Sequence, residues 1–204
     1  MKEMPMADTS TQKQPVDFYF DPSCPWAWRT ALWIKEVEKV RPIEVTWKFL
    51  SLAKINEEGD YARDSHADSH ATFPLLARAR ERFGNDAVCR LYVALGQARH
   101  EHKESLGDPE VIERCLKEAG LDPAWRTEAA SDPGMEERIM AEHQEALARH
   151  GAFGVPTISV AGKKGFFGPV INSVPEGEDA GELWDHVAWL SARDDVFEYK
   201  RSRK

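Results

Sequence analysis

The sequence is poor in cysteine, in long apolar runs and in positive charge. Its three cysteines are an odd number and too few for a disulfide framework. No apolar run approaches the roughly 20 residues that a membrane-spanning helix needs. Asp and Glu (35) outnumber Lys and Arg (27), which gives a net charge of −8. Because nucleic acids and anionic membranes attract clustered positive charge, we expect neither as a partner.

The length and the first residues indicate the number of domains and the compartment. The 204 residues, 42% of them hydrophobic, suffice for one domain with a sizeable core or for a domain with one large insertion. Residues 1–15 are polar and lack the apolar segment of a signal peptide, so we expect a disordered lead and a cytoplasmic protein. Cysteines in that compartment stay reduced, which favours reactive or structural roles over a disulfide.

The first elements read as strand, helix and strand. The apolar run 16–20 predicts a strand, and apolar residues at helical spacing predict a helix over 25–40. In the segment 43–49, apolar and polar residues alternate, which indicates a strand with one buried face. This order is the start of a parallel βαβ unit.

The next segment, 56–151, predicts helices only. Three Asp-Pro pairs place an N-cap acceptor before a proline at the first helical position, at 108–109, 122–123 and 132–133. Gly84, Gly120 and Gly151 occupy positions typical of helix C-termini. We interpret this block as an all-helical insertion.

Strands return after the block. Residues 157–160 are rich in β-formers, and a turn at 162–165 leads to Phe166 and Phe167, which predicts a hairpin. An amphipathic helix follows over about 178–192. The order βαβ, helical block, ββα predicts an α/β protein with a thioredoxin-like fold, built from 16–55 and 152–200, that carries a large all-helical insertion over 56–151.

Cys24 is the strongest candidate for chemistry. It falls where the first strand gives way to a helix that begins at Pro25, so we expect it at the helix N-cap, where unpaired N–H groups favour a thiolate. Lowering a thiol pKa from about 8.5 by about two units needs roughly 2.7 kcal/mol, whereas a helix terminus usually supplies roughly 0.3–1 kcal/mol and at best about 2 kcal/mol. Amides near Trp26 and Ala27 must then supply the rest. The alternative is that Cys24 is a small buried hydrophobic residue.

Four segments together resemble one family. The runs FYFDPSCPWAW, IEVTWKFLSLA, GVPTISVAGKKGFFGPV and GELWD are similar to the DsbA-like family of mycothiol-dependent nitroreductases, over about residues 16–200. The resemblance implies a thioredoxin domain interrupted by helices, and redox chemistry with the low-molecular-weight thiol mycothiol or a similar thiol as co-substrate. The reduction of nitro compounds is likewise implied by the resemblance alone.

The sequence departs from the dithiol members of this family at Ala27. A cysteine three residues after Cys24 could close a disulfide, and Ala27 cannot. The cycle that remains is a monothiol one, in which Cys24 forms a mixed disulfide that an external thiol releases. The sequence leaves open whether Ala27 is natural or was engineered to trap an intermediate.

The resemblance also implies the substrate-binding residues. In thioredoxin-like proteins, the proline before the third strand is cis and faces the active cysteine, and Pro156 occupies that position. We therefore expect Val155 and Pro156 to contact the thiol substrate, together with Pro25 and with Trp26 as a wall of the pocket. Trp28, Phe166 and Phe167 are interpreted as core residues.

Other candidates have simpler interpretations. Cys89 and Cys115 lie on apolar helix faces and are expected to be packed away from Cys24. His66 and His70 stand four apart among acidic residues, but lack a metal motif, so a polar surface is favoured and no metal is expected. His143 and His150 precede the Pro156 loop, and a general-acid role for them stays open. Nucleotide-binding motifs are missing, so we expect no tightly bound cofactor.

The combined hypothesis is a monothiol thiol–disulfide oxidoreductase that acts on small-molecule or protein disulfides. Two alternatives stay open. One is an enzyme like the kappa-class glutathione transferases or 2-hydroxychromene-2-carboxylate isomerases, which usually carry Ser at the position of Cys24. The other is a non-catalytic thiol-binding stress protein. A homodimer also stays open.

Overall fold

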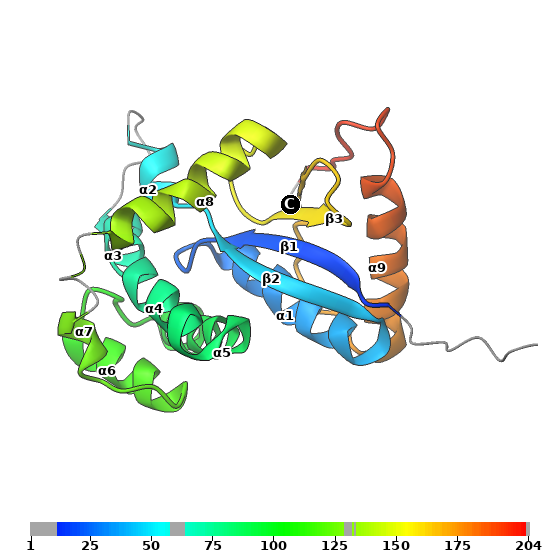
Figure 1. Ribbon diagram of the computed structural model, residues 1–204. Coiled ribbons are helices and arrows are strands. Elements are labelled where there is room, and N and C mark those ends of the chain that lie inside the picture. The colour runs from blue at the N-terminus through cyan, green and yellow to red at the C-terminus, as the bar shows by residue number, and fades with distance from the viewer. Residues whose placement is uncertain (1–11, 58–63, 129–131, 133, 203–204) are drawn as a thin grey trace, which may run out of the picture.

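A four-stranded sheet forms the centre of the molecule. The computed structural model describes residues 12–57, 64–128, 132 and 134–202 (Figure 1). The strands lie in the order β2-β1-β3-β4. Strand β1 (Gln14–Phe20) pairs in parallel with β2 (Ile43–Phe49) and antiparallel with β3 (Thr157–Val160), which pairs antiparallel with β4 (Phe166–Phe167). The first and last parts of the chain therefore share one sheet, as the sequence predicts.

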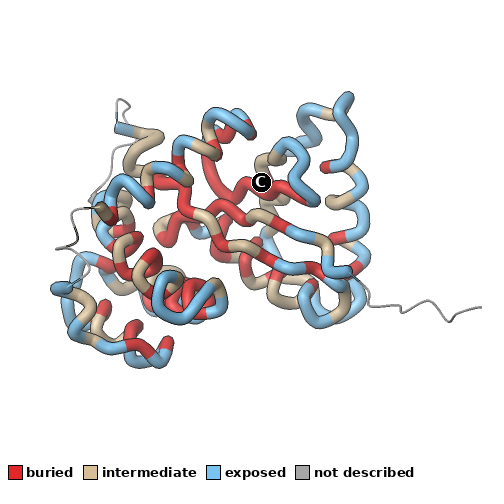
Figure 2. The backbone as a smooth tube through the Cα atoms, viewed as in Figure 1, coloured by how far each residue is buried: buried red, intermediate tan, exposed pale blue. Residues whose placement is uncertain are grey.

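Alternating side chains explain how this sheet builds its core. The apolar residues of β2 that the sequence places on one face, Ile43, Val45, Trp47 and Phe49, are all buried. Phe18 of β1 stands opposite Trp47 in the register, and their rings lie 5.0 Å apart. Figure 2 shows that buried positions concentrate along these central strands. This core holds the end of β1 in place, and the turn that leads to Cys24 starts there.

Two helices from opposite ends of the chain pack together on the sheet. Helix α1 (Pro25–Val40) has the bounds that the sequence predicts, and α9 (Gly177–Ser191) starts one residue earlier than expected. Trp33 of α1 donates its indole N–H to the carbonyl of Ala180 at 3.1 Å, and its ring lies 6.0 Å from that of Trp184. The buried seam between the two helices anchors α1, and with it the first turn beside Cys24.

Every element described between β2 and β3 is a helix. This block gathers on one side of the sheet in Figure 1. Its elements are α2 (Leu52–Ile55), α3 (Asp64–His70), α4 (Phe73–Phe83), α5 (Asn85–Gly96), the π-helical segment η1 (Gln97–Glu101), α6 (Pro109–Glu118), α7 (Trp125–Glu128) and α8 (Met135–His150). None of the helices described is long and apolar enough to cross a bilayer.

The structure corrects the expected N-terminal lead. The lead was expected to run through residue 15, but β1 begins at Gln14. Gln14 donates its N–H to the carbonyl of Pro42 at 2.7 Å, and the carbonyl of Pro15 accepts the N–H of Ala161 at 2.8 Å. These backbone bonds extend the strand although the two side chains lack strand character. Residues 1–11 lie outside the described residues.

The Asp-Pro pairs behave in two ways. Asp108 caps α6 as expected, accepting the N–H of Glu110 at 2.9 Å. Asp122 and Asp132 likewise accept the N–H groups two residues on, but α7 and α8 begin only at Trp125 and Met135. The prediction of helix starts at those two pairs is wrong, because an Asp side chain can close a local turn in place of a cap. Pro133 lies outside the described residues.

Candidate active site

Cys24 caps the N-terminus of α1. Its φ and ψ of −85° and 113° are extended, and its Sγ accepts the N–H of Ala27 at 3.4 Å. The thiol also donates to the carbonyl of Val155, 3.4 Å away. Cys24 is only 7% exposed, so its sulfur is largely buried. The N-cap position, and the amide that the sequence argument required there, are confirmed.

The two hydrogen bonds of Cys24 favour different protonation states. The Ala27 amide and the positive end of α1 stabilise the thiolate, whereas the carbonyl of Val155 can accept only from the neutral thiol. A hydrogen bond to a charged acceptor is worth about 1.5–3 kcal/mol, and a thiol is a weak donor. The amide and the helix terminus therefore favour the thiolate, whereas the burial of Cys24 opposes it.

Asp21 holds the turn that delivers Cys24. Its side chain is fully buried and accepts the amide and hydroxyl of Ser23 at 2.8 and 2.7 Å. It also accepts the amide of Leu52 at 2.7 Å and the hydroxyl of Ser69 at 2.6 Å. One carboxylate thus joins the active-site turn to the start of the helical insertion. The sequence analysis missed this role, for which the DPSC order, an Asp three residues before the cysteine, is the available signal.

The Val155–Pro156 segment lies against Cys24 as expected. The peptide bond between these two residues is cis, and Val155 is 4% exposed. The hydroxyl of Thr157 donates to the carbonyl of Gly154 at 2.8 Å, and the amide of Gly168 donates to the carbonyl of Pro156 at 2.9 Å. These bonds fix the loop on both sides of Val155, and so fix the carbonyl that faces the Cys24 thiol.

The two tryptophans after Cys24 have different surroundings. Trp26 is partly exposed, and the guanidinium of Arg29 lies over its ring at 5.2 Å. Arg29 also donates to the side-chain carbonyl of Asn172 at 3.1 Å, in the loop after β4. Trp28 is buried, as expected, and its ring stacks on that of His100 at 6.1 Å. The first turn of α1 therefore contacts both the late loop and the helical insertion.

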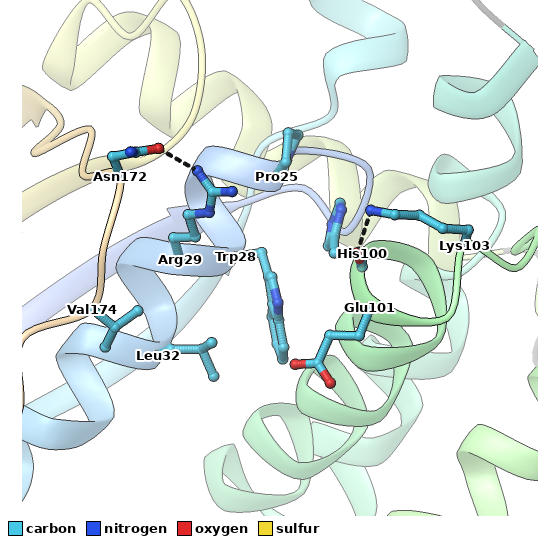
Figure 3. A pocket seen from close by; sticks show the side chains of 9 residues that line it. All are labelled: Pro25, Trp28, Arg29, Leu32, His100, Glu101, Lys103, Asn172 and Val174. Carbon is cyan, nitrogen blue, oxygen red and sulfur yellow. Dashed lines mark hydrogen bonds between the residues drawn. The ribbon is translucent and has the colours of Figure 1, made fainter.

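A cavity of about 280 Å³ lies beside this first turn (Figure 3). One wall comes from α1, through Pro25, Trp28, Arg29 and Leu32. The facing wall comes from η1 and the residues after it, through His100, Glu101 and Lys103, and the loop after β4 adds Asn172 and Val174. Because Pro25 directly follows Cys24, the cavity adjoins the reactive turn.

His100 is a site residue that the sequence analysis missed. It lies in η1, lines the cavity and donates its Nε2–H to the carbonyl of Pro22 at 2.9 Å. Burial, with nearby Arg99 and Lys103, lowers the pKa of His100 to about 4, although the Pro22 carbonyl opposes this shift. The imidazole is thus neutral near pH 7. The polar run around His100 has no pattern that could have shown it, because a π-helical segment leaves no periodic signal.

The other two cysteines are packed among helices. Cys89 and Cys115 are 8% and 0% exposed, as expected from their apolar faces. Burial raises the pKa of both thiols, that of Cys115 to about 11. The ammonium of Lys35 lies 3.6 Å from Cys89 and partly offsets the effect of burial there. Both thiols are therefore poor nucleophiles at neutral pH.

The histidine candidates serve the packing of the chain. Among the residues described, no three metal-ligating side chains cluster together. His70 contacts the hydroxyl of Ser51 at 2.9 Å and the carboxylate of Glu136 at 3.2 Å. The Nδ1 atoms of His143 and His150 accept backbone amides, those of Ser51 and Gly165 respectively. Burial lowers the pKa of both.

The hairpin aromatic residues are less buried than expected. Phe166 and Phe167 are both partly exposed, and Phe167 lies 4.8 Å from the ring of Phe153, which is 69% exposed. The expectation of a core position for both is wrong. The two-residue strand β4 lies at the edge of the sheet, so only one side of it is covered.

The family comparison matches nearly the whole chain. Residues 23–201 match the model of the Rv2466c-like family, described as mycothiol-dependent nitroreductase Rv2466c. The chain belongs to this family. It is also 34% identical, over 193 residues, to a protein of Mycobacterium tuberculosis (strain ATCC 25618 / H37Rv) described as uncharacterized protein Rv2286c, covering 92% of this chain and 82% of that protein.

Solved structures show the same fold at low identity. A probable DsbA oxidoreductase, SCO1869 from Streptomyces coelicolor, aligns with a TM-score of 0.61 at 20% identity, over 91% of this chain and 94% of that one. The cytosolic disulfide reductase DsbM from Pseudomonas aeruginosa, solved with GSH, aligns with a TM-score of 0.61 at 13% identity, over 85% and 98%. These likenesses confirm the DsbA-like thioredoxin fold.

Proposed function

We propose that this family member is a monothiol thiol–disulfide oxidoreductase that uses Cys24 and a low-molecular-weight thiol such as mycothiol. One observation carries the proposal. Cys24 accepts the amide of Ala27 at the N-terminus of α1, and residue 27, where a second active-site cysteine would lie, is itself an alanine that is fully buried. The site can therefore stabilise one thiolate but cannot close a disulfide within its first turn.

The proposed cycle has two exchange steps. The Cys24 thiolate attacks one sulfur of a substrate disulfide, forms a mixed disulfide with it and releases the other sulfur as a thiolate. An external thiolate then attacks the sulfur that Cys24 carries, which frees the Cys24 thiolate and leaves a new disulfide between the two small thiols. In the net exchange the external sulfur enters the new disulfide, the displaced sulfur of the substrate leaves as a thiolate, and the protein ends as it began; a second external thiolate that attacks the new disulfide completes the two-electron reduction of the substrate.

Four residues around Cys24 would guide the substrate. The carbonyl of Val155, which accepts the thiol of the resting protein, would accept an amide of a bound thiol substrate once the sulfur is ionised. Pro156 holds this segment beside the sulfur. Pro25 and Trp26 follow Cys24 directly and are the exposed and partly exposed surface nearest to it. These positions support a contact role for all four.

The co-substrate follows from the family rather than from the geometry. The matched family is described as mycothiol-dependent, and one structural neighbour is a cytosolic disulfide reductase solved with GSH. Both descriptions support a soluble thiol as the electron source and a reducing compartment such as the cytoplasm. Nitro compounds, as well as small-molecule or protein disulfides, are the substrates that we propose from the family's description.

The direct experiment is incubation with mycothiol disulfide, followed by intact mass and peptide mapping. We expect one adduct of one mycothiol on Cys24, which reduced mycothiol removes. Cys24→Ser should form no adduct, and the matched variants Cys89→Ser and Cys115→Ser should form it as the native chain does. Absence of an adduct would favour an enzyme that activates a bound thiol without a protein disulfide. An adduct that mycothiol cannot remove would favour a non-catalytic thiol-binding protein.

A further inference from the structure

We propose that the cavity between α1 and η1 binds the neutral, hydroxyl-rich part of the thiol co-substrate while its sulfur reacts at Cys24. The inference rests on the proposed function and adds a second contact region to it. The first argument is position. The cavity touches the reactive turn at both ends, because Pro25 lines it and His100, in its wall, is bonded to the carbonyl of Pro22. A molecule whose sulfur reached Cys24 past Pro25 would enter this space.

The second argument is size. At about 280 Å³, the cavity is slightly smaller than the roughly 300–1,000 Å³ that ligand pockets occupy. It suits one fragment of a ligand rather than a whole dinucleotide or flavin. A thiol that carries a polar group of moderate size, joined to its cysteine part by a short link, is the kind of molecule that needs such a side pocket.

The third argument is the mixture of hydrogen-bonding groups. Arg29 and Lys103 supply donors, Glu101 supplies an acceptor and Asn172 supplies both. Figure 3 shows the Arg29 and Asn172 pair on one side of the cavity and the His100 to Lys103 segment on the other. A site for an anion would present donors only. Hydroxyl groups both donate and accept, so a polyol matches this alternation.

His100 adds an acceptor that stays neutral. Its Nε2–H is used on the Pro22 carbonyl, which leaves Nδ1 as the acceptor nitrogen of the ring. Because the imidazole remains uncharged near pH 7, it adds no positive charge to the cavity. The apolar part of the lining comes from Trp28, Leu32 and Val174. Ring C–H groups of a polyol can pack on such surfaces while its hydroxyls bond to the polar groups.

The test compares two thiols that share the end that carries the sulfur and differ in the rest of the molecule. Cys24 is first converted to its mixed disulfide with nitrothiobenzoate, and peptide mass verifies one adduct. An entering thiolate attacks Sγ of Cys24, breaks the S–S bond and releases the coloured nitrothiobenzoate thiolate. Rates are measured with mycothiol and with N-acetylcysteine, which has the same reactive end but a carboxylate in place of the polyol. We expect mycothiol to react about tenfold faster, as about 1.4 kcal/mol of extra contact would give.

Two variants and one control locate that advantage. Asn172→Ala removes a polar group of the cavity, and Leu32→Trp fills the cavity from α1. In each variant the ratio of the mycothiol rate to the N-acetylcysteine rate should fall at least about threefold toward one. The N-acetylcysteine rate itself should stay unchanged. Lys39→Ala, on the same helix and ion-paired to Glu36 away from the cavity, should keep the native ratio. Rates that fall equally for both thiols would indicate a structural effect on Cys24 and overturn the inference.

The remaining outcomes separate the inference from the proposed function. A native ratio near one, with both thiols reacting, would overturn the subsite and leave the thiol exchange at Cys24 intact. Glutathione, an anionic thiol, reacting faster than mycothiol and losing that advantage in Leu32→Trp would show an anion site, contrary to the polyol assignment. Failure of every thiol to react with the Cys24 adduct would overturn the proposed function and the subsite together.

Discussion

Trp28 lies directly against the backbone of Gly96, so that a Cβ built at residue 96 would stand 2.2 Å from Cε3 of the indole. Gly96 ends α5, and Trp28 lies one turn after Cys24 in α1. The contact therefore joins the helical insertion to the helix that carries the reactive cysteine. Only a residue without a side chain allows this approach.

The first prediction concerns this contact. Gly96→Ala should lower the free energy of unfolding by about 1–3 kcal/mol, the range for an overpacked core, because the indole must shift. Urea unfolding measures it. Gly134→Ala is the matched control, since the only close contact of a Cβ there is with the far end of the long Arg138 side chain, at 2.7 Å, and Asp132 Oδ1 is 3.7 Å away. Equal losses in the two variants would show that the Trp28 contact is loose.

The second prediction concerns the buried carboxylate. Asp21→Asn puts an NH₂ in place of one carboxylate oxygen, so that it faces either the Leu52 amide, which donates to Oδ2, or the Ser23 and Ser69 donors, which bind Oδ1. We expect a loss of about 2–3 kcal/mol in unfolding free energy, because at least one buried donor is left unpaired. Ser69→Ala removes a single partner and should cost about 1 kcal/mol. If Asp21→Asn loses no more unfolding free energy than Ser69→Ala, this account of the turn is contradicted.

The third prediction is a pH dependence that His100 causes. Its pKa is about 4 in the folded protein against 6.5 for an ordinary histidine, so the unfolded chain binds the proton more tightly. The contribution to stability is complete above pH 6.5, declines as the pH falls from 6.5 to about 4, and changes no further below that. Unfolding free energies between these limits should fall less steeply in His100→Gln than in the native chain. Parallel curves would contradict the lowered pKa.

The fourth prediction restores a second thiol. In Ala27→Cys, residues 24 and 27 lie on the first turn of α1, with the Ala27 amide already bonded to the Cys24 sulfur at 3.4 Å. We expect an intramolecular disulfide under mild oxidation, detected by peptide mapping. Ala31→Cys is the matched control: residue 31 is also buried, but it lies about 10 Å from Cys24 along the helix axis and should form no disulfide. A free thiol at residue 27 after oxidation would contradict the geometry.

Much of the fold could be predicted because its signals are local. The alternation in β2, the bounds of α1 and the Cys24 cap each depend on a few neighbouring residues. The family resemblance pointed to Val155 and Pro156 from their sequence context alone. Such features need no knowledge of distant contacts.

The features that were missed depend on partners far apart in the chain. Asp21 acts through Ser69, 48 residues away, and His100 reaches Pro22, 78 residues away. The strand character of Gln14 comes from its bond to Pro42 rather than from its own side chain. Periodicity cannot show these contacts, because they form only when the insertion closes on the sheet.

The central claim is that Cys24 is the one thiol activated as a nucleophile. The most direct test measures the alkylation rate of each cysteine as a function of pH, with peptide mass identifying which cysteine has reacted. We predict a midpoint for Cys24 well below the value of about 8.5 for a free thiol, with Cys89 and Cys115 reacting only slowly in the folded protein. A Cys24 midpoint at or above about 8.5, or faster alkylation of either buried cysteine, would contradict the account.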